Sequence, residues 1–529
     1  MSPGLRNLEL TIGLLALVLL LVQLSKRIPL PYPAVMALAG LLIALLPGIP
    51  IVEFNPEFVL VVFLPPILYS AAWNTSWPEF KRNLRPIAFL AVGLVFATMV
   101  AVAMAVHAAV PTMPWAVAFL LGAIVSPPDA IAATAIFERL GVPRRLVSIL
   151  EGESLINDAG ALVAFRTALA VALTGAFSWE HTIWQLVMAA AGGLAVGLAA
   201  GALVTHLHRR VIDPLTSTAI SLVAPYAVYI VAEWLGASGV LAVVASGILV
   251  TRRSDDIFCP ATRLAAIPTW QLFTLLVNGL AFTLIGLQVQ VVFTDLAPGD
   301  HWQVFWVCTV VVVVVIAVRI AWIALTARLA TGWKNSLAFS DRAVIAWAGM
   351  RGVVSLAAAM SIPRFLPDGT SFPYRDLVIA STFAVVFASL VFQGSTLPGL
   401  IRWLGVRPNA WETSEHEYAV AASATEALRI IGIESQAREV PAAVRERLLE
   451  EHIARVVPEA LIHARAEVDE HHRNLHLERV IRRRIVEAER AAIAGLRQSG
   501  AIGEGTFRRL ERELDLQEQL LDAMPIEDD

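Results

Sequence analysis

Residues 1–407 consist largely of long apolar segments, and this feature limits the possible folds more than any other. Cut at prolines, glycines and charged clusters, the region gives thirteen segments, the first at 8–25 and the last at 377–401. A helix needs about 20 apolar residues to cross a bilayer, and all but one of the segments come near that length. The sequence therefore predicts an all-α polytopic membrane protein with about thirteen transmembrane helices.

Charge is concentrated beyond these segments. Residues 408–529 contain 41 of the chain's 84 charged residues. We therefore predict two domains, a membrane domain at 1–407 and a cytosolic helical tail at 408–529 with helices near 440–468 and 475–497. The formal net charge of −4 disfavours nucleic acid as a partner. We interpret the tail as a regulatory or dimerisation domain. Its histidines are expected to be solvated and not to bind a metal: His452, His463, His471, His472 and His476.

Loop charges predict the orientation of the chain. Alternate connections carry 18 of the 24 Lys and Arg residues of the membrane domain, and three lie in the other connections. Basic loops stay on the cytoplasmic side, so the amino terminus is expected outside and the tail inside. Lys26 and Arg27 follow the first apolar segment, and no small-residue cleavage site is evident. This pattern favours a retained membrane helix over a signal peptide.

Two of the apolar segments contain helix-breaking sequences. Segment 114–137 includes Ser126-Pro127-Pro128-Asp129, and segment 342–361 includes Ala348-Gly349-Met350-Arg351-Gly352. Consecutive prolines remove backbone donors, and unpaired backbone is tolerated at bilayer depth only inside protein or beside an aqueous cavity. The two segments, fifth and twelfth, occupy equivalent places in two inverted six-helix repeats, a pattern typical of secondary transporters. Two unrelated kinks are the alternative.

The most unusual charges form the run Glu151–Asp158 in segment 145–174. Ionisable groups cost roughly 3 kcal/mol each at bilayer depth, so they are rare there without an ion pathway. Helical spacing places Ser154 and Asp158 on one face, and Glu153 and Asn157 on the next. Asp158 lies about 20 Å along the helix from the segment's start. A carboxylate with a nearby hydroxyl is a plausible site for a small hard cation, and Asp129 is a candidate to join it.

Arginines inside the spans need partners. Arg351 cannot lose its proton, so burial requires a carboxylate, and we predict a structural ion pair with Glu153. Backbone or lipid-headgroup partners are expected for Arg166 and Arg319.

The run Glu-Gly-Glu-Ser-Leu-Ile-Asn-Asp at Glu151–Asp158 resembles the signature of the monovalent cation:proton antiporter-1 family, the sodium/proton exchangers. Trp347–Ser355 is similar to that family's arginine-bearing span. The resemblance covers about three quarters of the chain. It implies a homodimeric antiporter of the bacterial plasma membrane that exchanges Na⁺, or alternatively K⁺ or Li⁺, for H⁺. It also implies that Asp158 carries the ion and the proton, that Ser154 is a ligand, and that Glu153 pairs with Arg351.

Two departures from the family pattern affect the site. The usual Thr-Asp-Pro is replaced by Pro128-Asp129-Ala130, which leaves the Pro128 carbonyl as a possible ligand in place of a threonine hydroxyl. Many archaeal-type members have Phe-Glu-Ala-Ala in the third span, where this chain has Tyr69-Ser70-Ala71-Ala72. The choice between Na⁺ and K⁺ therefore stays open. The candidate ion and proton site comprises Asp158, Asp129, Ser154, Asn157 and Pro128.

A channel and an intramembrane enzyme are the alternatives. A channel needs a continuous polar pore, whereas the charges here gather at one depth. An enzyme needs a nucleophile with its base, or a metal set, and no such pattern occurs within the spans, so no catalytic residue or cofactor is predicted. Asn157 stands where transporters thought to move two protons have a second aspartate. We therefore predict electroneutral exchange, with Asp129 as the residue most able to alter it.

Overall fold

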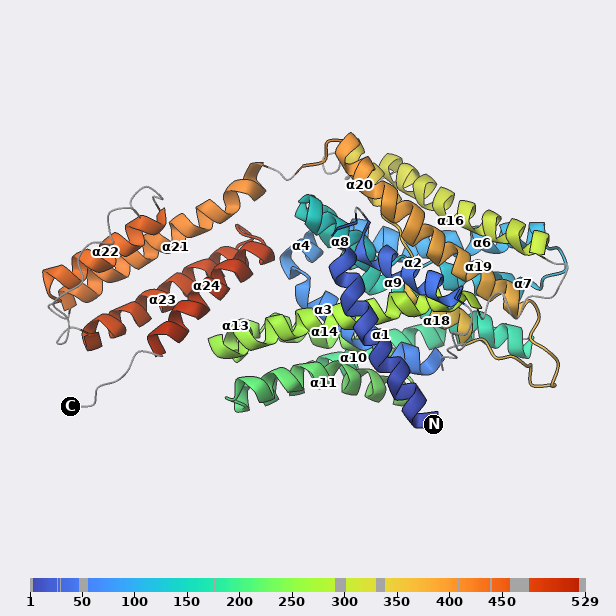
Figure 1. The fold of residues 1–529 in the computed structure, drawn as a ribbon, viewed down its shortest axis with the longest axis horizontal. Coiled ribbons are helices and arrows are strands. Elements are labelled where there is room, and N and C mark those ends of the chain that lie inside the picture. Colours follow the sequence, from blue (N-terminus) through green and yellow to red (C-terminus); the bar gives the residue numbers. More distant parts are fainter. Residues whose placement is uncertain are drawn as a thin grey trace. The chain divides into compact units, whose positions relative to one another are not determined.

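The computed structural model describes residues 3–25, 27–28, 30–46, 56–175, 177–290, 301–329, 338–407, 410–437, 440–456 and 475–522. Within these ranges the secondary structure is helical, apart from turns and one isolated bridge between Phe365 and Ser371 (Figure 1). The predicted all-α fold is confirmed.

Eight helices in the described ranges are long and apolar enough to cross a membrane, and four shorter apolar helices accompany them. The count of thirteen spans and the inverted repeat stay predictions.

The helices before the tail are α1 (Pro3–Ser25), α2 (Tyr32–Ala44), α3 (Pro56–Asn74), α4 (Trp77–Arg82), α5 (Leu84–Ala88), α6 (Val95–Ala109), α7 (Trp115–Val125), α8 (Ala130–Leu140), α9 (Arg144–Thr174), α10 (Trp179–Arg210), α11 (Pro214–Trp234), α12 (Gly239–Thr251), α13 (Ser254–Ile257), α14 (Pro260–Leu287), α16 (His301–Leu329), α17 (Phe339–Trp347), α18 (Val353–Met360), α19 (Arg375–Ala388) and α20 (Gly394–Trp403).

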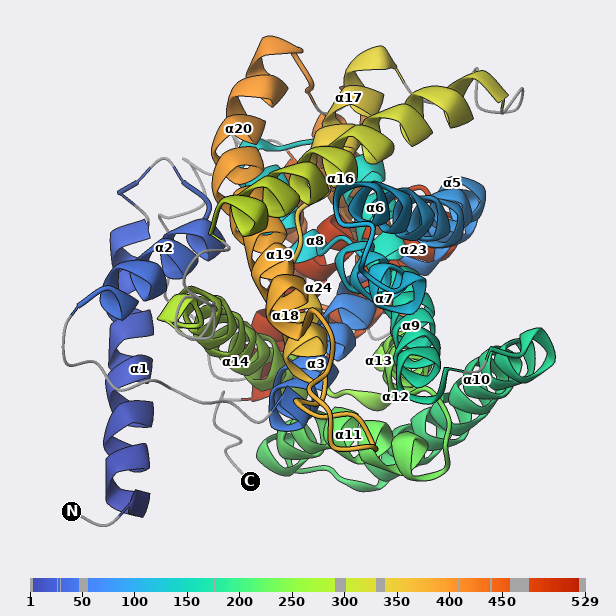
Figure 2. The ribbon, with the colours of Figure 1, turned by 90° about the vertical axis from the view of Figure 1, so that its right-hand side faces the viewer.

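Both predicted helix breaks are present. The fifth apolar segment is divided into α7 and α8, and the twelfth into α17 and α18. Helix α18 lies in the middle of the membrane helices, where it packs against α3, α7, α9 and α19 (Figure 2). A π-helical segment, Ser389–Gln393, joins α19 to α20 and packs against α2. The breaks therefore lie in the protein interior, where the exposed backbone can find partners.

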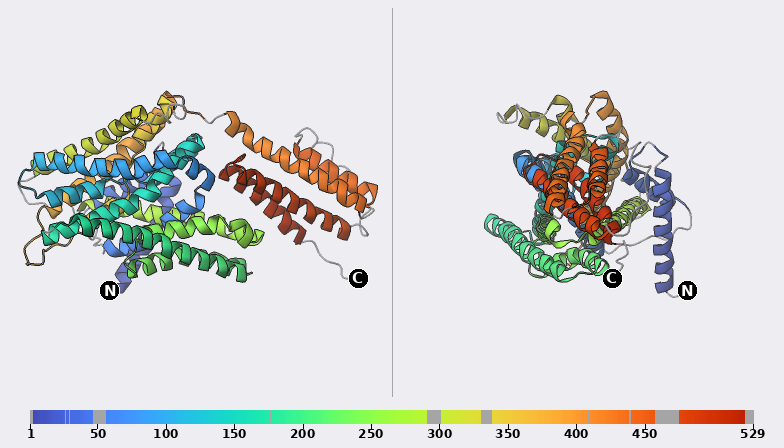
Figure 3. Two further views of the ribbon diagram at one scale, coloured as in Figure 1. Left: turned by 180° about the vertical axis from the view of Figure 1, so that it is seen from behind. Right: turned by 90° about the vertical axis from the view of Figure 1, so that its left-hand side faces the viewer.

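The chain forms two compact units. The first contains residues 1–206, 220–253 and 270–407, and the second contains residues 207–219, 254–269 and 408–529. The second unit thus adds two segments from the ends of membrane helices to the predicted tail. Its tail helices, seen also in Figure 3, are α21 (Ala410–Ala437), α22 (Ala442–Val456), α23 (Leu475–Gln498) and α24 (Glu504–Asp522).

The second unit has a buried charge cluster at the first turn of α14. Arg263 is 7% exposed and its guanidinium binds Asp515 on α24, with Glu511 Oε1 3.3 Å from its Nε. Arg490 on α23 also donates to Asp515, at 3.0 Å. This cluster fixes the tail helices to the amino-terminal end of α14.

The expectation that the tail histidines are solvated was wrong for His452. Its ring is buried, with Nε2 3.7 Å from Glu489 Oε1. His463, His471 and His472 lie outside the described residues, and for His476 only the helical backbone is described.

Candidate ion-binding site

The two helix breaks meet each other. The Asp129 amide donates to the Met350 carbonyl at 2.6 Å, which joins the break Ser126–Asp129 to the break Ala348–Gly352. A side chain at Gly352 would overlap the Asp129 carboxylate, so this close approach requires glycine. Asp129 also caps α8, because its Oδ1 accepts from the Ile131 amide at 2.9 Å. Asp129 is therefore held at the crossing by its own backbone and by the start of α8.

Arg351 stabilises the point where the two breaks meet by donating hydrogen bonds to backbone carbonyl groups. Its Nε donates to the Val125 carbonyl at 3.1 Å, and Nη1 donates to the Gly349 carbonyl. The Arg351 amide donates to Ser389 Oγ in the π-helical segment at 2.9 Å. The last carbonyls of a helix carry partial negative charge, so the guanidinium is stabilised by the end of α7.

The predicted Glu153–Arg351 ion pair was wrong in its partner. Glu153 Oε1 and Oε2 accept from Arg319 Nη1 and Nη2 at 2.6 and 2.9 Å, and both side chains are fully buried. Arg319 Nε also donates to the Ile345 carbonyl at 3.1 Å, so one guanidinium joins α9, α16 and α17. Two parallel bonds satisfy a planar guanidinium better than one, and Arg351 is already supplied by carbonyls. The expected backbone partner of Arg319 is therefore present, but its ion pair with Glu153 was not predicted.

Arg166 likewise has a protein partner. Its Nη2 lies 2.7 Å from Glu233 Oε2, at the end of α11. Glu233 Oε1 accepts from the Gly239 amide at the start of α12. The pair is partly exposed and connects three helices away from the breaks.

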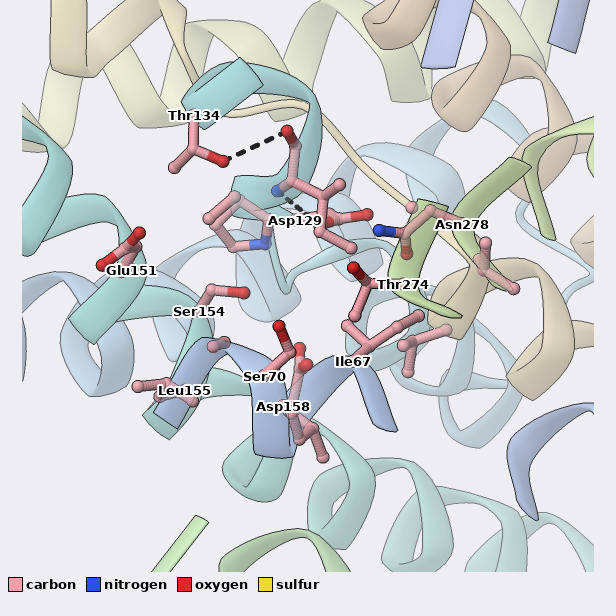
Figure 4. A pocket seen from close by; sticks show the side chains of 18 of the residues that line it. Ile67, Ser70, Asp129, Thr134, Glu151, Ser154, Leu155, Asp158, Thr274 and Asn278 are labelled. Carbon is pink, nitrogen blue, oxygen red and sulfur yellow. Dashed lines mark hydrogen bonds between the residues drawn. The ribbon is translucent and has the colours of Figure 1, made fainter. Parts of the chain in front are cut away.

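Four of the five candidate site residues line one cavity. Its volume is about 230 Å³, which is ample for a cation with water. Figure 4 shows Ser154 on α9, Asp158 and Ser70 near one another, and Asp129 above them. The polar residues around it are Tyr32, Ser70, Asn74, Asp129, Thr134, Glu138, Glu151, Ser154, Asp158, Thr274, Asn278 and Ser355, and the prolines are Pro127 and Pro128.

Asn157 is the candidate that does not line the cavity. It is fully buried, and its Nδ2 donates to the Pro128 carbonyl at 3.1 Å. Two of the predicted ligands thus bind each other, and Asn157 supports the broken backbone from the neighbouring helix. The carbonyl of Pro128 keeps a second lone pair, because a carbonyl oxygen accepts two hydrogen bonds.

Sequence reasoning missed the wall formed by α14. Thr274 and Asn278 line the cavity opposite Ser154 (Figure 4). Tyr32 on α2 also lines it. The polar residues Gln271, Thr274 and Asn278 within a largely apolar span were the available signal.

Comparison with known proteins places this arrangement among membrane transporters. The family model described as sodium/hydrogen exchanger, transmembrane, matches residues 13–403. An uncharacterized Na⁺/H⁺ exchanger of Mycobacterium tuberculosis (strain H37Rv) is 34% identical over 98% of this chain and 97% of its own length. A sodium, potassium, lithium and rubidium/H⁺ antiporter of Bacillus pumilus is 32% identical over 74% of this chain and 61% of its own.

A solved structure agrees in fold. The sodium proton antiporter MjNhaP1 of Methanocaldococcus jannaschii superposes with a TM-score of 0.60 over 75% of this chain and 99% of its own, at 20% identity. The family match and the apolar helices show a multi-pass membrane transporter. This chain belongs to the sodium/hydrogen exchanger family.

Proposed function

We infer that this protein is a secondary antiporter that exchanges Na⁺ for H⁺ and that Asp158 is the group for which the two ions compete. The observation that carries the inference is the contrast on α9. Asp158 lines a cavity beside two broken helices, whereas Glu153 is bound on both oxygens by Arg319. A fixed charge cannot exchange ions, but a carboxylate facing a cavity can bind a proton or a cation.

The groups around Asp158 fit a small monovalent cation. Asp129 and Ser154 carry oxygen at the same cavity, which Pro128 also lines, and oxygen is the ligand that hard cations prefer. A cation that enters displaces the proton from Asp158, and the proton returns when the cation leaves.

The stoichiometry follows from which carboxylates are free to change charge. Glu153 stays charged through the cycle because Arg319 stays bound to it, and Asn157 carries an amide in place of a second acid. One carboxylate then exchanges one proton for one monovalent cation, and transport is electroneutral. Asp129 lines the same cavity and is the group most able to add a second proton.

K⁺ is the second candidate substrate. A hydroxyl, Ser70, faces the cavity where many archaeal-type relatives have an acid, and weaker ligand fields favour larger cations. The name of the Bacillus pumilus relative includes potassium, lithium and rubidium. The transported ion is therefore best established by direct comparison of Na⁺, Li⁺, K⁺ and Rb⁺.

We further propose a transporter without enzymatic activity that forms a homodimer in the bacterial plasma membrane, with the amino terminus outside and the tail in the cytoplasm. The distribution of loop arginines and lysines supports this orientation. Reporter fusions after Arg407 and at the amino terminus, one active only in the cytoplasm and one only outside, test it.

Reconstituted proteoliposomes with an imposed pH difference test the function. Addition of Na⁺ should dissipate the pH difference, and replacement by choline should not. A cation channel would instead pass cations without obligatory proton movement, so ²²Na⁺ uptake that is independent of the proton gradient would contradict antiport.

A further inference from the structure

The cavity has a polar wall on α14 that is separate from the residues of the breaks. Thr274 and Asn278 are four residues apart, so they lie on the same face of the helix. Both line the cavity, and Figure 4 shows them on the other side of it from Ser154. The site is thus enclosed by polar groups from α3, α9, α14 and the break before α8.

Asn278 presents an oxygen that has no hydrogen-bond partner in the described part of the chain. The residue is 9% exposed, and Oδ1 is buried. Tyr32, another polar residue of the same cavity, lies near Asn278. An unsatisfied buried acceptor costs about 1–3 kcal/mol. This cost is removed if the oxygen binds a ligand in the cavity.

Thr274 points to the same ligand chemistry. Its hydroxyl donates to the Trp270 carbonyl at 2.8 Å, so its proton is used within the helix. The oxygen keeps its lone pairs for an acceptor role. Two neighbouring groups on α14 therefore offer oxygen lone pairs, which suits a cation.

We propose that Asn278 is a cation ligand whose neutral oxygen sets which monovalent cation the exchanger prefers. The proposal rests on the function inferred above. Asp158, Asp129 and Ser154 would coordinate the ion from one side. A bound cation also needs ligands on its other side. The number and field strength of the oxygens decide how well they replace the water around each cation. A substitution at Asn278 should therefore change the affinity for different cations to different extents.

Transport kinetics in proteoliposomes test this directly. We compare wild type with Asn278→Leu, which keeps the size of the side chain and removes its oxygen, using Na⁺, Li⁺ and K⁺. The KM for Na⁺ should rise about tenfold, as expected for loss of one contact with a charged group. The ratio of kcat/KM between Na⁺ and K⁺ should change as well.

Thr283→Val is the matched control on the same helix. Thr283 is fully buried, donates to the Gly279 carbonyl at 2.8 Å and lies outside the cavity. The Thr283→Val substitution removes a buried polar group from α14 without changing a residue of the cavity. KM values and ion ratios of this variant should match wild type, and an equal change in both variants would overturn the proposal.

A binding measurement keeps the test independent of transport. Na⁺ that binds the folded state raises Tm in proportion to the logarithm of its concentration above Kd. Asn278→Leu should need about tenfold more Na⁺ for the same rise. If Asn278→Leu does not fold, Asn278→Asp keeps the shape and adds a charge, and it should lower the KM for Na⁺ at alkaline pH.

The outcomes separate the two claims. If wild type exchanges Na⁺ and a folded Asn278→Leu has unchanged KM, ion ratio and Na⁺ requirement, the ligand role of Asn278 is wrong and the antiport function stands. An unchanged KM for Na⁺ in Asn278→Asp would also show that Asn278 is not a ligand. If wild type neither exchanges nor is stabilised by any of the three cations, both claims fail.

Discussion

Two carboxylates on α9, five residues apart, have opposite surroundings. Glu153 is fully buried and both of its oxygens accept from Arg319, whereas Asp158 opens onto a cavity with Asp129 and Ser154. Both are acids at bilayer depth, so their sequence context alone does not separate structural charge from working charge. The bound guanidinium separates the two roles. It fixes Glu153 as a structural charge, whereas Asp158 has no such partner among the described residues and can exchange a proton for a cation.

The largest effect is expected at Asp158. Asp158→Asn should fold and lose cation-dependent proton movement, because an amide can neither carry the proton nor balance the cation. The pH difference in proteoliposomes on addition of Na⁺ is the measurement, with thermal unfolding in detergent as the check on folding. Asp368→Asn, the same change in an exposed loop, is the control and should exchange normally. Near-normal exchange by a folded Asp158→Asn would remove Asp158 from its role.

Glu153 should act on stability. Glu153→Gln strands Arg319 in the interior, which costs roughly 3–5 kcal/mol, so the yield of folded protein and its Tm should both fall. Adding Arg319→Gln removes the unpaired charge and should restore part of that loss.

The double variant Glu153→Gln with Arg351→Gln tests which of the two arginines is the partner of Glu153. Arg351 donates to the carbonyls of Val125 and Gly349, so its removal should leave the defect of Glu153→Gln in place or worsen it. Recovery with Arg351→Gln and none with Arg319→Gln would contradict the observed pairing.

Removal of the tail should have a moderate effect. A chain ending at Arg407 keeps every residue of the cavity, so measurable exchange should remain. Its pH profile or dimer stability should shift, because the truncation also deprives Arg263 of Asp515 and Glu511. Asp515→Asn in the full chain is a smaller test of the same contact. A correctly inserted, dimeric truncation that is inactive at every pH would show that the tail takes part in transport.

The membrane potential should have the smallest effect, which is none. With one cation exchanged for one proton, the Na⁺-dependent rate should be the same with and without a potential set by K⁺ and valinomycin. A rate that rises with the potential means that net charge moves. Asp129→Asn would then be the first variant to examine, because Asp129 lines the cavity at the helix break and has no arginine partner among the described ion pairs.

The parts predictable from sequence are those with local causes. Two prolines and two glycines broke the helices where expected, and helical spacing placed Ser154 and Asp158 at one cavity. The partner of Glu153 was not predictable in this way. Three arginines inside the spans were available. Only the packing of α16 against α17 brings Arg319 to α9, while Arg351 turns to the end of α7.

Neutral polar residues were the other omission. Thr274 and Asn278 carry no charge, so they cost little in a membrane span and gave a weak signal beside the acids. Their place at the cavity depends on how α14 lies against the breaks, which is a property of the folded chain.

The central claim is that a proton and a cation compete for Asp158, and proton release on binding tests it most directly. Purified protein in a weakly buffered solution with a pH indicator is mixed with NaCl or choline chloride over a series of pH values. Because a metal displaces the proton of the carboxylate that binds it, Na⁺ should release up to one proton per chain, and Asp158→Asn should release none. No release by wild type, or equal release by Asp158→Asn, would contradict the account.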